Sequence, residues 1–492
     1  MENNLFDGNR EKILWNVSLV HERRLKVLDD HISNLLENSD AGKFDLLNKK
    51  IDILANFRNE FNTYKKDIRN IKSTIELQET SDINTKRFMK GGKAIASGGF
   101  GCVFKPALKC LNKKKKFKGV SKLMLKKYSI DEYNEINKFK KVINKIKDNE
   151  KYFLLNNISI CKPNKLSNDD LIEYNKCNNL IKKGITYKNI NLNLNKLGLL
   201  QLPDGGIDLR MFFEKNITYK DIININNLLI ELLKNGIIKM NKKKLYHFDI
   251  KNSNMLIKNS KIRLIDWGLA DIQEKDEIPN NCKGRPFQFN LPFSCILFNS
   301  FFNEWYNTQL NNGDTFYNIA YKLIEYTNNY RGEGHFKYIK DIITTFKLDF
   351  IATYLSNKYK INIDNNNYYL NIIINYLVNI FEKYTNFTTN TFMDKKYFNE
   401  VFSKNVDIWG FLISYKPMIY VNNNNLKFII LLIINNYLFT GFYAAKPINI
   451  KKLISNLEYI NNINNININI KNEIFTNQSL NIISLNSIKE KI

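Results

Sequence analysis

The segment Tyr246–Leu256 restricts what this chain can fold into more than any other part of the sequence, because it places three reactive side chains at a fixed spacing. Asp249 can accept the proton of a substrate hydroxyl, and Lys251, two residues later, can neutralise a migrating phosphoryl group. Asn254 offers a neutral oxygen ligand for a magnesium ion. A chance match to this pattern is improbable. The preceding His247 is expected to be a packed structural residue without a chemical role.

Two further charged residues interrupt apolar, strand-like segments. Asp266 ends one such strand and is followed by a tryptophan and a glycine, so it could chelate magnesium between two phosphates. Lys122 lies in the middle of Val120–Met124 and needs a partner for its charge if it points inward. Such a lysine can hold phosphates, and a carboxylate from the next helix would keep it in place. The sequence favours Glu135 over Glu132 for that role.

Glycines between two predicted strands indicate a nucleotide-binding hairpin. The segment Ile95–Val103 reads Ile-Ala-Ser-Gly-Gly-Phe-Gly-Cys-Val, and its glycines would let backbone N–H groups approach phosphates closely. Its first and last residues would offer apolar contact to an adenine. Alone, such a pattern is more often an ordinary turn. The expected nucleotide-binding residues are Ile95, Ala96, Gly98, Gly99, Phe100, Gly101, Val103, Val120, Lys122 and Leu256.

In this order, the motifs resemble the signature of eukaryotic-type protein kinases: glycine-rich loop, strand lysine, helix glutamate, catalytic loop and metal-binding Asp-Phe-Gly, here with Trp267. The seventeen-residue step from Asp249 to Asp266 is similar to that of the family. Val406–Gly410 resembles the start of the buried helix that anchors the catalytic loop from below, in which Asp407 is structural. More narrowly, Arg285–Ser294 is similar to the divergent serine/threonine kinases of giant double-stranded DNA viruses.

The resemblance implies ATP and Mg²⁺ as cofactors and proteins as substrates. Lys251 resembles the serine/threonine subgroup, so tyrosine acceptors are disfavoured. The implied catalytic residues are Lys122, Glu135, Asp249, Lys251, Asn254 and Asp266, with Asn254 and Asp266 as the metal ligands.

Several positions depart from the family pattern. Ala96 replaces the first glycine of the loop, and Phe248 replaces the arginine that normally pairs with a phosphorylated activation loop. The segment from Ala270 to Pro292 contains no serine, threonine or tyrosine. The sequence therefore predicts a kinase that is not switched on by phosphorylation of this segment. The adenine-reading hinge is expected in Leu200–Gly206.

The implied fold is α+β: a bilobal kinase fold with a small β-rich N-lobe containing one main helix and a large, mostly helical C-lobe. Heptad-like apolar spacing predicts an N-terminal helical hairpin or coiled coil over residues 1–85. The N-lobe is expected over 86–204 and the C-lobe over 205–492, with a helical insert at about 295–403 that either recognises a partner or braces the fold.

Charge and cysteine content suggest a setting for the protein. The formal charge of +26 allows an acidic or nucleic-acid partner, with Lys113–Lys118 as the candidate patch, although lysine is abundant throughout. The six cysteines form no C-x-x-C pair, which predicts a reduced, intracellular protein without a zinc site. We expect no signal peptide and no membrane insertion, and a cytoplasmic location, in the host cytoplasm or the virion if the protein is viral.

Two other functions compete with an active protein kinase. A pseudokinase scaffold would bind nucleotide without turnover, but it requires a broken catalytic residue, and Lys122, Asp249, Asn254 and Asp266 are all present. A small-molecule kinase of the choline or aminoglycoside type lacks the lysine two residues after the catalytic aspartate. The presence of Lys251 therefore disfavours it.

Overall fold

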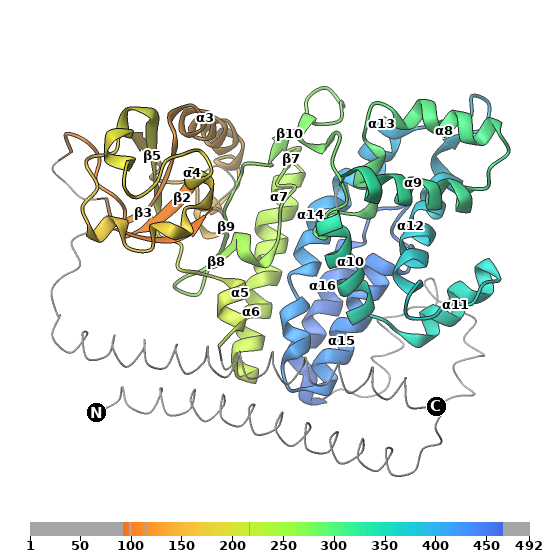
Figure 1. Ribbon diagram of the computed structural model, residues 1–492. Coiled ribbons are helices and arrows are strands. Elements are labelled where there is room, and N and C mark those ends of the chain that lie inside the picture. Colours follow the sequence, from red (N-terminus) through yellow and green to blue (C-terminus); the bar gives the residue numbers. More distant parts are fainter. Residues whose placement is uncertain (1–91, 98–100, 114–116, 216, 332, 466–492) are drawn as a thin grey trace, which may run out of the picture. The chain divides into compact units, whose positions relative to one another are not determined.

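Figure 1 shows the computed structural model, which describes residues 92–97, 101–113, 117–215, 217–331 and 333–465. The chain divides into two compact units, Met1–Met89 and Lys90–Ile492, and the described residues belong to the second. The expected helical hairpin over 1–85 lies outside the described residues. So do Gly98, Gly99 and Phe100 of the glycine-rich loop and residues 114–116 of the lysine patch.

An antiparallel five-stranded sheet forms the N-terminal part of this unit (Figure 1). Its strand order is β1-β2-β3-β5-β4. Its strands are β1 (Lys93–Ser97), β2 (Gly101–Lys105), β3 (Gly119–Leu125), β4 (Ser159–Cys161) and β5 (Leu197–Pro203). Ser121 and Leu123 on β3 are buried on one face, as the two-residue period of a strand requires. Lys122 points to the other face, opposite Val103 and Leu200 on the neighbouring strands, so it lies at the centre of the sheet.

One long helix, α3 (Lys126–Ile143), starts directly after β3 and packs against the sheet. Its buried residues Ile136, Phe139 and Ile143 recur at intervals of three and four, which gives the helix a single apolar face. The helix begins at Lys126, because the chain continues from the strand without a loop. With this start, Glu132 is the glutamate of the helix that reaches Lys122 on the sheet.

Two disulfides cross-link the sheet part, which corrects the expectation of reduced cysteines. Cys102 on β2 bonds Cys177, and Cys110 bonds Cys161 on β4. The Cα atoms are 5.1 and 5.8 Å apart, within the range that a disulfide spans. The partners are separated by 75 and 51 residues, so the spacing of cysteines in the sequence could not reveal that they meet.

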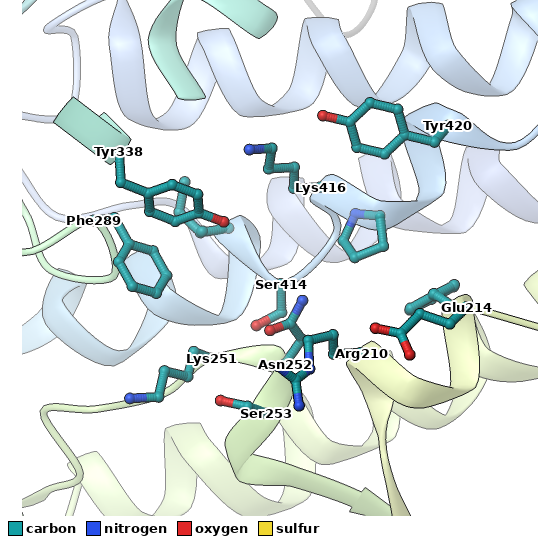
Figure 2. Close-up of a pocket in the computed structure, with 13 residues that line it drawn as sticks. Arg210, Glu214, Lys251, Asn252, Ser253, Phe289, Tyr338, Ser414, Lys416 and Tyr420 are labelled. Atoms are coloured by element: carbon teal, nitrogen blue, oxygen red, sulfur yellow. The ribbon is translucent and has the colours of Figure 1, made fainter. Parts of the chain in front are cut away.

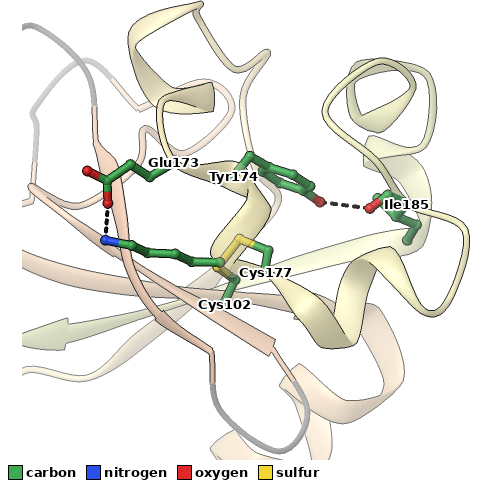
Figure 3. Close-up of a disulfide and its surroundings, with 6 residues drawn as sticks. Cys102, Glu173, Tyr174, Cys177 and Ile185 are labelled. Carbon is green, nitrogen blue, oxygen red and sulfur yellow. Dashed lines mark hydrogen bonds and ion pairs between the residues drawn. A yellow bond between two sulfur atoms is a disulfide. The ribbon is translucent and has the colours of Figure 1, made fainter. Parts of the chain in front are cut away.

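The first disulfide fastens an irregular segment, between β4 and β5, to the sheet (Figure 3). This segment consists mainly of short helical turns, including α4 (Asn178–Ile181). Beside the disulfide, Glu173 forms ion pairs with Lys93 and Lys176, and the Tyr174 hydroxyl donates a hydrogen bond to the Ile185 carbonyl at 3.1 Å. The disulfide therefore links β2, the strand after the glycine-rich loop, to the irregular segment between β4 and β5.

The remainder of the unit is mostly helical, so the mixed α+β composition is confirmed, with the sheet in the N-terminal part. The main helices are α5 (Leu209–Phe213), α6 (Tyr219–Glu231), α7 (Ile238–Asn241), α8 (Phe302–Asn311), α9 (Phe316–Arg331), α10 (Glu333–Thr345), α11 (Asp349–Tyr359), α12 (Tyr368–Tyr384), α13 (Asp394–Tyr397), α14 (Ser403–Ile413), α15 (Asn424–Ile434) and α16 (Ile450–Glu458). None of the helices within the described ranges combines the length and apolar character needed to span a bilayer.

Helices α8–α13 occupy the region of the expected insert, and they belong to the main core. Most residues of α12 are buried, and Tyr376 on this helix packs edge-on against Phe293 and Trp409. Phe336 on α10 packs against Phe287. The region therefore braces the fold, which is one of the two roles expected for it.

Short strand pairs hold the loops between the sheet and the helices. One small sheet has the order β6-β8-β9, and β7 pairs with β10. These strands are β6 (Ile207–Asp208), β7 (Leu245–Tyr246), β8 (Met255–Ile257), β9 (Ile262–Leu264) and β10 (Asp271–Ile272). Leu264 also exchanges backbone hydrogen bonds with the segment after α3, donating to Tyr152 at 2.8 Å and accepting from Leu154 at 3.2 Å. The segments that carry Asp249, Asn254 and Asp266 are thus joined to the sheet part.

Candidate active site

Asp249 lies at the centre of a hydrogen-bonded group in the loop between β7 and β8. Its side chain is almost completely buried. Lys251 Nζ donates to both carboxylate oxygens, at 3.0 and 2.9 Å, and Asn254 Nδ2 donates to Oδ2 at 2.9 Å. Asn254 also donates to the Asp249 backbone carbonyl at 2.9 Å. The structure therefore brings together the three residues that the sequence pattern selected, with the asparagine amide oxygen left as an acceptor.

Asn290 is a fourth member of this group that the sequence reasoning missed. Its Nδ2 donates to Asp249 Oδ1 at 2.8 Å and to the Ile250 carbonyl at 3.3 Å. The residue comes from the loop after β10, in the segment noted above for its lack of hydroxyl side chains. A single buried asparagine gives no signal in a chain that is rich in asparagine.

Replacing Asn290 with alanine should lower the turnover number of the activity proposed below about fivefold to tenfold, because one charge-assisted hydrogen bond that orients Asp249 is lost. The apparent affinity for nucleotide should not change. Steady-state kinetics of Asn290→Ala would measure this, with Asn280→Ala, an exposed position in the same segment, as the control. An unchanged turnover number in the Asn290 variant, at unchanged melting temperature, would remove its positioning role.

Asp266 follows β9 and adopts a left-handed backbone conformation, with φ of 63°. Most residues with a Cβ avoid this region, so its surroundings must fix the conformation. The amide of Ile265 donates to the Asn254 carbonyl at 3.0 Å, which joins this segment to the catalytic loop. The Asp266 carboxylate is exposed. It and the amide oxygen of Asn254 are the two oxygen ligands that the chain offers here.

This donor set fits a magnesium ion that is shared with a nucleotide. Magnesium prefers oxygen ligands and is commonly held by one or two protein side chains, with phosphates and waters completing the shell. Among the residues that the structure describes, no group of three or more histidine, cysteine, aspartate or glutamate side chains could hold a metal alone. A metal at Asn254 and Asp266 would therefore take its other ligands from the nucleotide and water.

Lys122 pairs with Glu132, so the expectation that Glu135 holds this lysine is wrong. Lys122 Nζ donates to the two carboxylate oxygens of Glu132 at 2.9 and 2.7 Å, and both side chains are largely buried. Glu135 lies about 4.5 Å farther along the helix axis. Because α3 begins at Lys126, its second turn already lies over the centre of β3. Burial raises the pKa of Glu135, and the nearby Glu132, Asp131 and Asp271 raise it further.

The two glutamates form a matched pair for mutagenesis. Glu132→Gln should lower the kcat/KM for ATP by about tenfold or more, because it leaves the largely buried Lys122 without its counter-charge. Glu135→Gln should change this value less than about twofold, since no ion pair is lost. Nucleotide-dependent steady-state rates of the two variants would measure the difference. A larger loss in Glu135→Gln than in Glu132→Gln would instead support Glu135 as the partner of Lys122.

An aromatic group connects α3 to the catalytic loop and to Asp266. The Trp267 ring packs against His247, Phe139 and Phe153, with centroid distances of 4.9, 6.0 and 5.8 Å. His247 is fully buried, and its Nε2 lies 3.0 Å from the Ile265 carbonyl, in agreement with the structural role expected for it. Phe139 lies two helical turns after Glu132 on the same face of α3. The helix that holds Lys122 thus also contacts the residue after Asp266.

Helix α14 supports the catalytic loop from beneath through Asp407. This buried carboxylate accepts hydrogen bonds from the backbone amides of His247 and Phe248, at 2.9 and 3.0 Å, and from Asn241 Nδ2 at 2.8 Å. Its burial raises the pKa, whereas the donated hydrogen bonds lower it. One turn later, a Cβ on Gly410 would lie 2.2 Å from the Ile250 carbonyl, so only glycine allows the helix to approach the loop. The structural role expected for Asp407 is confirmed.

The segment from Ala270 to Pro292 is held by packing. Arg285 is buried, and it donates to the Phe248 carbonyl at 3.4 Å and to Gln288 Oε1 at 2.6 Å. Trp409 Nε1 donates to the Phe289 carbonyl at 3.1 Å. The Phe289 ring in turn packs against His335 and Tyr338 of α10. Arg285, Trp409 and helix α10 therefore hold the segment that carries Asn290.

The remaining expected nucleotide residues are distributed over β1, β2, β3 and β8. Val103 and Val120 are half-buried on β2 and β3, and Leu256 is half-buried on β8. A Cβ on Gly205, in the expected hinge, would lie 2.5 Å from Leu256 Cδ1. The others are Ile95 and Ala96, which are exposed on β1, and Gly101, which starts β2.

Comparisons with known proteins leave the family open. No protein-family model and no curated protein sequence matches the chain. One similar solved structure is the crystal structure of a kinase domain, with 17% sequence identity and a TM-score of 0.25. The match covers 42% of this chain and 56% of that kinase domain, so the chain spans only about half of it. No match bears on the expected similarity to kinases of large DNA viruses.

Proposed function

We propose that this protein is an ATP-dependent protein serine/threonine kinase with a bilobal fold, in which the nucleotide binds between the sheet part and the helical part. The observation that carries the proposal is the group around Asp249. A buried carboxylate, an ammonium group that contacts both of its oxygens, and an amide oxygen on the same short loop are the parts that phosphoryl transfer to a hydroxyl requires.

Asp249 would orient the hydroxyl of the acceptor residue and accept its proton. The hydroxyl oxygen forms the new bond to the γ-phosphorus, and the bond from this phosphorus to the bridging oxygen of ADP breaks. Lys251, held against Asp249, would offset the negative charge of the phosphoryl group during transfer. No covalent intermediate with the protein is required, because positioning and charge stabilisation supply most of the catalysis.

Lys122 would bind the phosphates of ATP, with Glu132 fixing the direction of its ammonium group. Asn254 and Asp266 would hold Mg²⁺, which neutralises charge on the β- and γ-phosphates when it is bound. The left-handed conformation of Asp266 and the packing of Trp267 would keep the second ligand in place. The glycine-rich segment would cover the phosphates from the sheet side.

We also propose that the enzyme is active without phosphorylation of the segment from Ala270 to Pro292. In this segment Arg285 contacts the backbone of Phe248, and Asn290 contacts Asp249. Protein treated with a phosphatase should therefore retain full activity. An activating phosphorylation site between residues 270 and 292, detected by mass spectrometry, would contradict this.

The direct test is transfer of label from [γ-³²P]ATP, in the presence of Mg²⁺, to a degenerate peptide library that contains serine and threonine. We expect label on peptides and none when EDTA removes the metal. A protein that gains thermal stability from Mg²⁺ and ATP but labels no peptide would instead be a pseudokinase. A protein that neither binds ATP nor transfers phosphate would overturn the proposal.

A further inference from the structure

A cavity of about 400 Å³ opens beside the catalytic loop (Figure 2). Lys251, Asn252 and Ser253 form one wall, next to Asp249. On the opposite side lie Lys416, at the start of the turn η12 (Lys416–Tyr420), and Tyr338 of α10. Phe289 also lines the cavity, so the cavity adjoins the segment that carries Asn290 and positions Asp249.

The charged side chains that line the cavity are mainly positive. They are Arg210 on α5, Lys251 and Lys416, against one carboxylate, Glu214. Lys251 is paired with Asp249, and Arg210 is mostly exposed, with its Nη2 3.7 Å from Asp208. Lys416 takes part in none of the ion pairs found among the described residues, so its charge remains available to a ligand.

Lys416 differs from the many solvated lysines of this chain. It is half-buried, and its Nζ lies 4.8 Å from the centre of the Tyr338 ring. Burial lowers the pKa of this lysine, and Asp341 acts in the opposite direction. A cation that is partly removed from water is stabilised by an anion that enters the same site. The high lysine content of the chain therefore does not explain why a lysine is half-buried at position 416.

We propose that the cavity receives an acidic side chain of the protein substrate, bound by Lys416 and Arg210, close to the serine or threonine that accepts the phosphate. The inference rests on the proposed kinase function and names its substrate class. Because Lys251 both lines the cavity and contacts Asp249, the acidic residue would lie close in sequence to the acceptor. A carboxylate or a phosphoryl group would satisfy the same cations.

The test uses synthetic peptides with one serine acceptor in a neutral background. Aspartate, phosphoserine, alanine or lysine is placed in turn at each of the four positions on either side. We expect a maximum at one position, where aspartate or phosphoserine raises kcat/KM about tenfold over alanine, and where lysine lowers it. Comparing aspartate with phosphoserine at that position tells which anion the site prefers.

Lys416→Glu should abolish this preference or reverse it in favour of lysine, and Arg210→Glu should weaken it. The exposed Lys427→Glu on α15 makes the same charge change away from the cavity and should retain the wild-type preference. Lys416→Met provides a second variant if the glutamate lowers the melting temperature.

Equal rates on acidic, neutral and basic peptides would overturn the inference and leave the kinase function intact. A preference that both Lys416 variants retain would also overturn it. If no peptide accepts label, the kinase function fails and the inference falls with it.

Discussion

Replacing Asp249 with asparagine is expected to lower the rate of phosphoryl transfer by about 10³-fold or more, since a general base and the charge that orients Lys251 are lost together. The amide has nearly the same shape but cannot take the proton of the acceptor. Whichever carboxylate oxygen it replaces, its NH₂ group would also face two donors, namely Lys251 and either Asn254 or Asn290. The effect should appear in kcat, while ATP binding persists. Single-turnover transfer of label to a peptide and a thermal shift with Mg²⁺ and ATP would measure the two quantities.

Asp276→Asn is the control for this experiment. Asp276 is exposed and forms an ion pair with Lys244 at 2.6 Å, so its loss should change the rate less than about twofold. Activity of Asp249→Asn within about tenfold of the wild type would exclude Asp249 as the base. Loss of ATP binding together with activity would instead indicate that the variant is misfolded.

The catalytic loop could be predicted from the sequence because its geometry is local. Asp249, Lys251 and Asn254 lie within six residues, so a single turn of the chain brings their side chains together. The structural role of Asp407, which is remote in the sequence, was predictable only through the resemblance of Val406–Gly410 to the buried helix of protein kinases. In the structure, this carboxylate accepts hydrogen bonds from the loop amides of His247 and Phe248.

The features that the sequence did not reveal depend on contacts between remote segments. The choice between Glu132 and Glu135 depended on the first residue of α3, and helix boundaries are the least reliable part of a sequence-based prediction. The disulfide partner of Cys102 depended on the path of an irregular segment without a repeating pattern. Asn290 depended on how the segment after β10 folds back onto the loop.

The packing of the helical region over α8–α13 also depends on contacts between remote segments. Its apolar spacing predicts helices, but spacing alone does not tell whether they pack on the main core or form a separate domain. The structure buries most residues of α12 and packs α10 against Phe287 and Phe289. Because these two phenylalanines flank Gln288 and precede Asn290, the helical region stabilises the segment that positions Asp249. Helix α10 thus contacts, through Phe287 and Phe289, the segment that positions Asp249.

Replacing Asp407 with alanine is expected to destabilise the protein by about 3 to 5 kcal/mol, because a buried acceptor of three hydrogen bonds is removed. The buried amides of His247 and Phe248 and the half-buried Asn241 side chain would lose their partner. Since Phe248 has a left-handed backbone, with φ of 55°, the loop also loses the contacts that hold this conformation. Thermal unfolding should show a lower melting temperature, and the transfer rate should fall even where the variant is still folded.

Asp407→Asn separates the two roles of this carboxylate, namely filling the space and accepting hydrogen bonds. The asparagine keeps one acceptor oxygen but turns an NH₂ group toward a donor, so its stability should lie between those of the wild type and the alanine variant. The solvent-exposed Asp349→Ala on α11 should leave the melting temperature nearly unchanged. If Asp407→Ala unfolds at the wild-type temperature, the hydrogen bonds that Asp407 accepts do not stabilise the catalytic loop. The positions of Asp249 and Lys251 would then depend on Arg285, Asn290 and the packing of Trp267 instead.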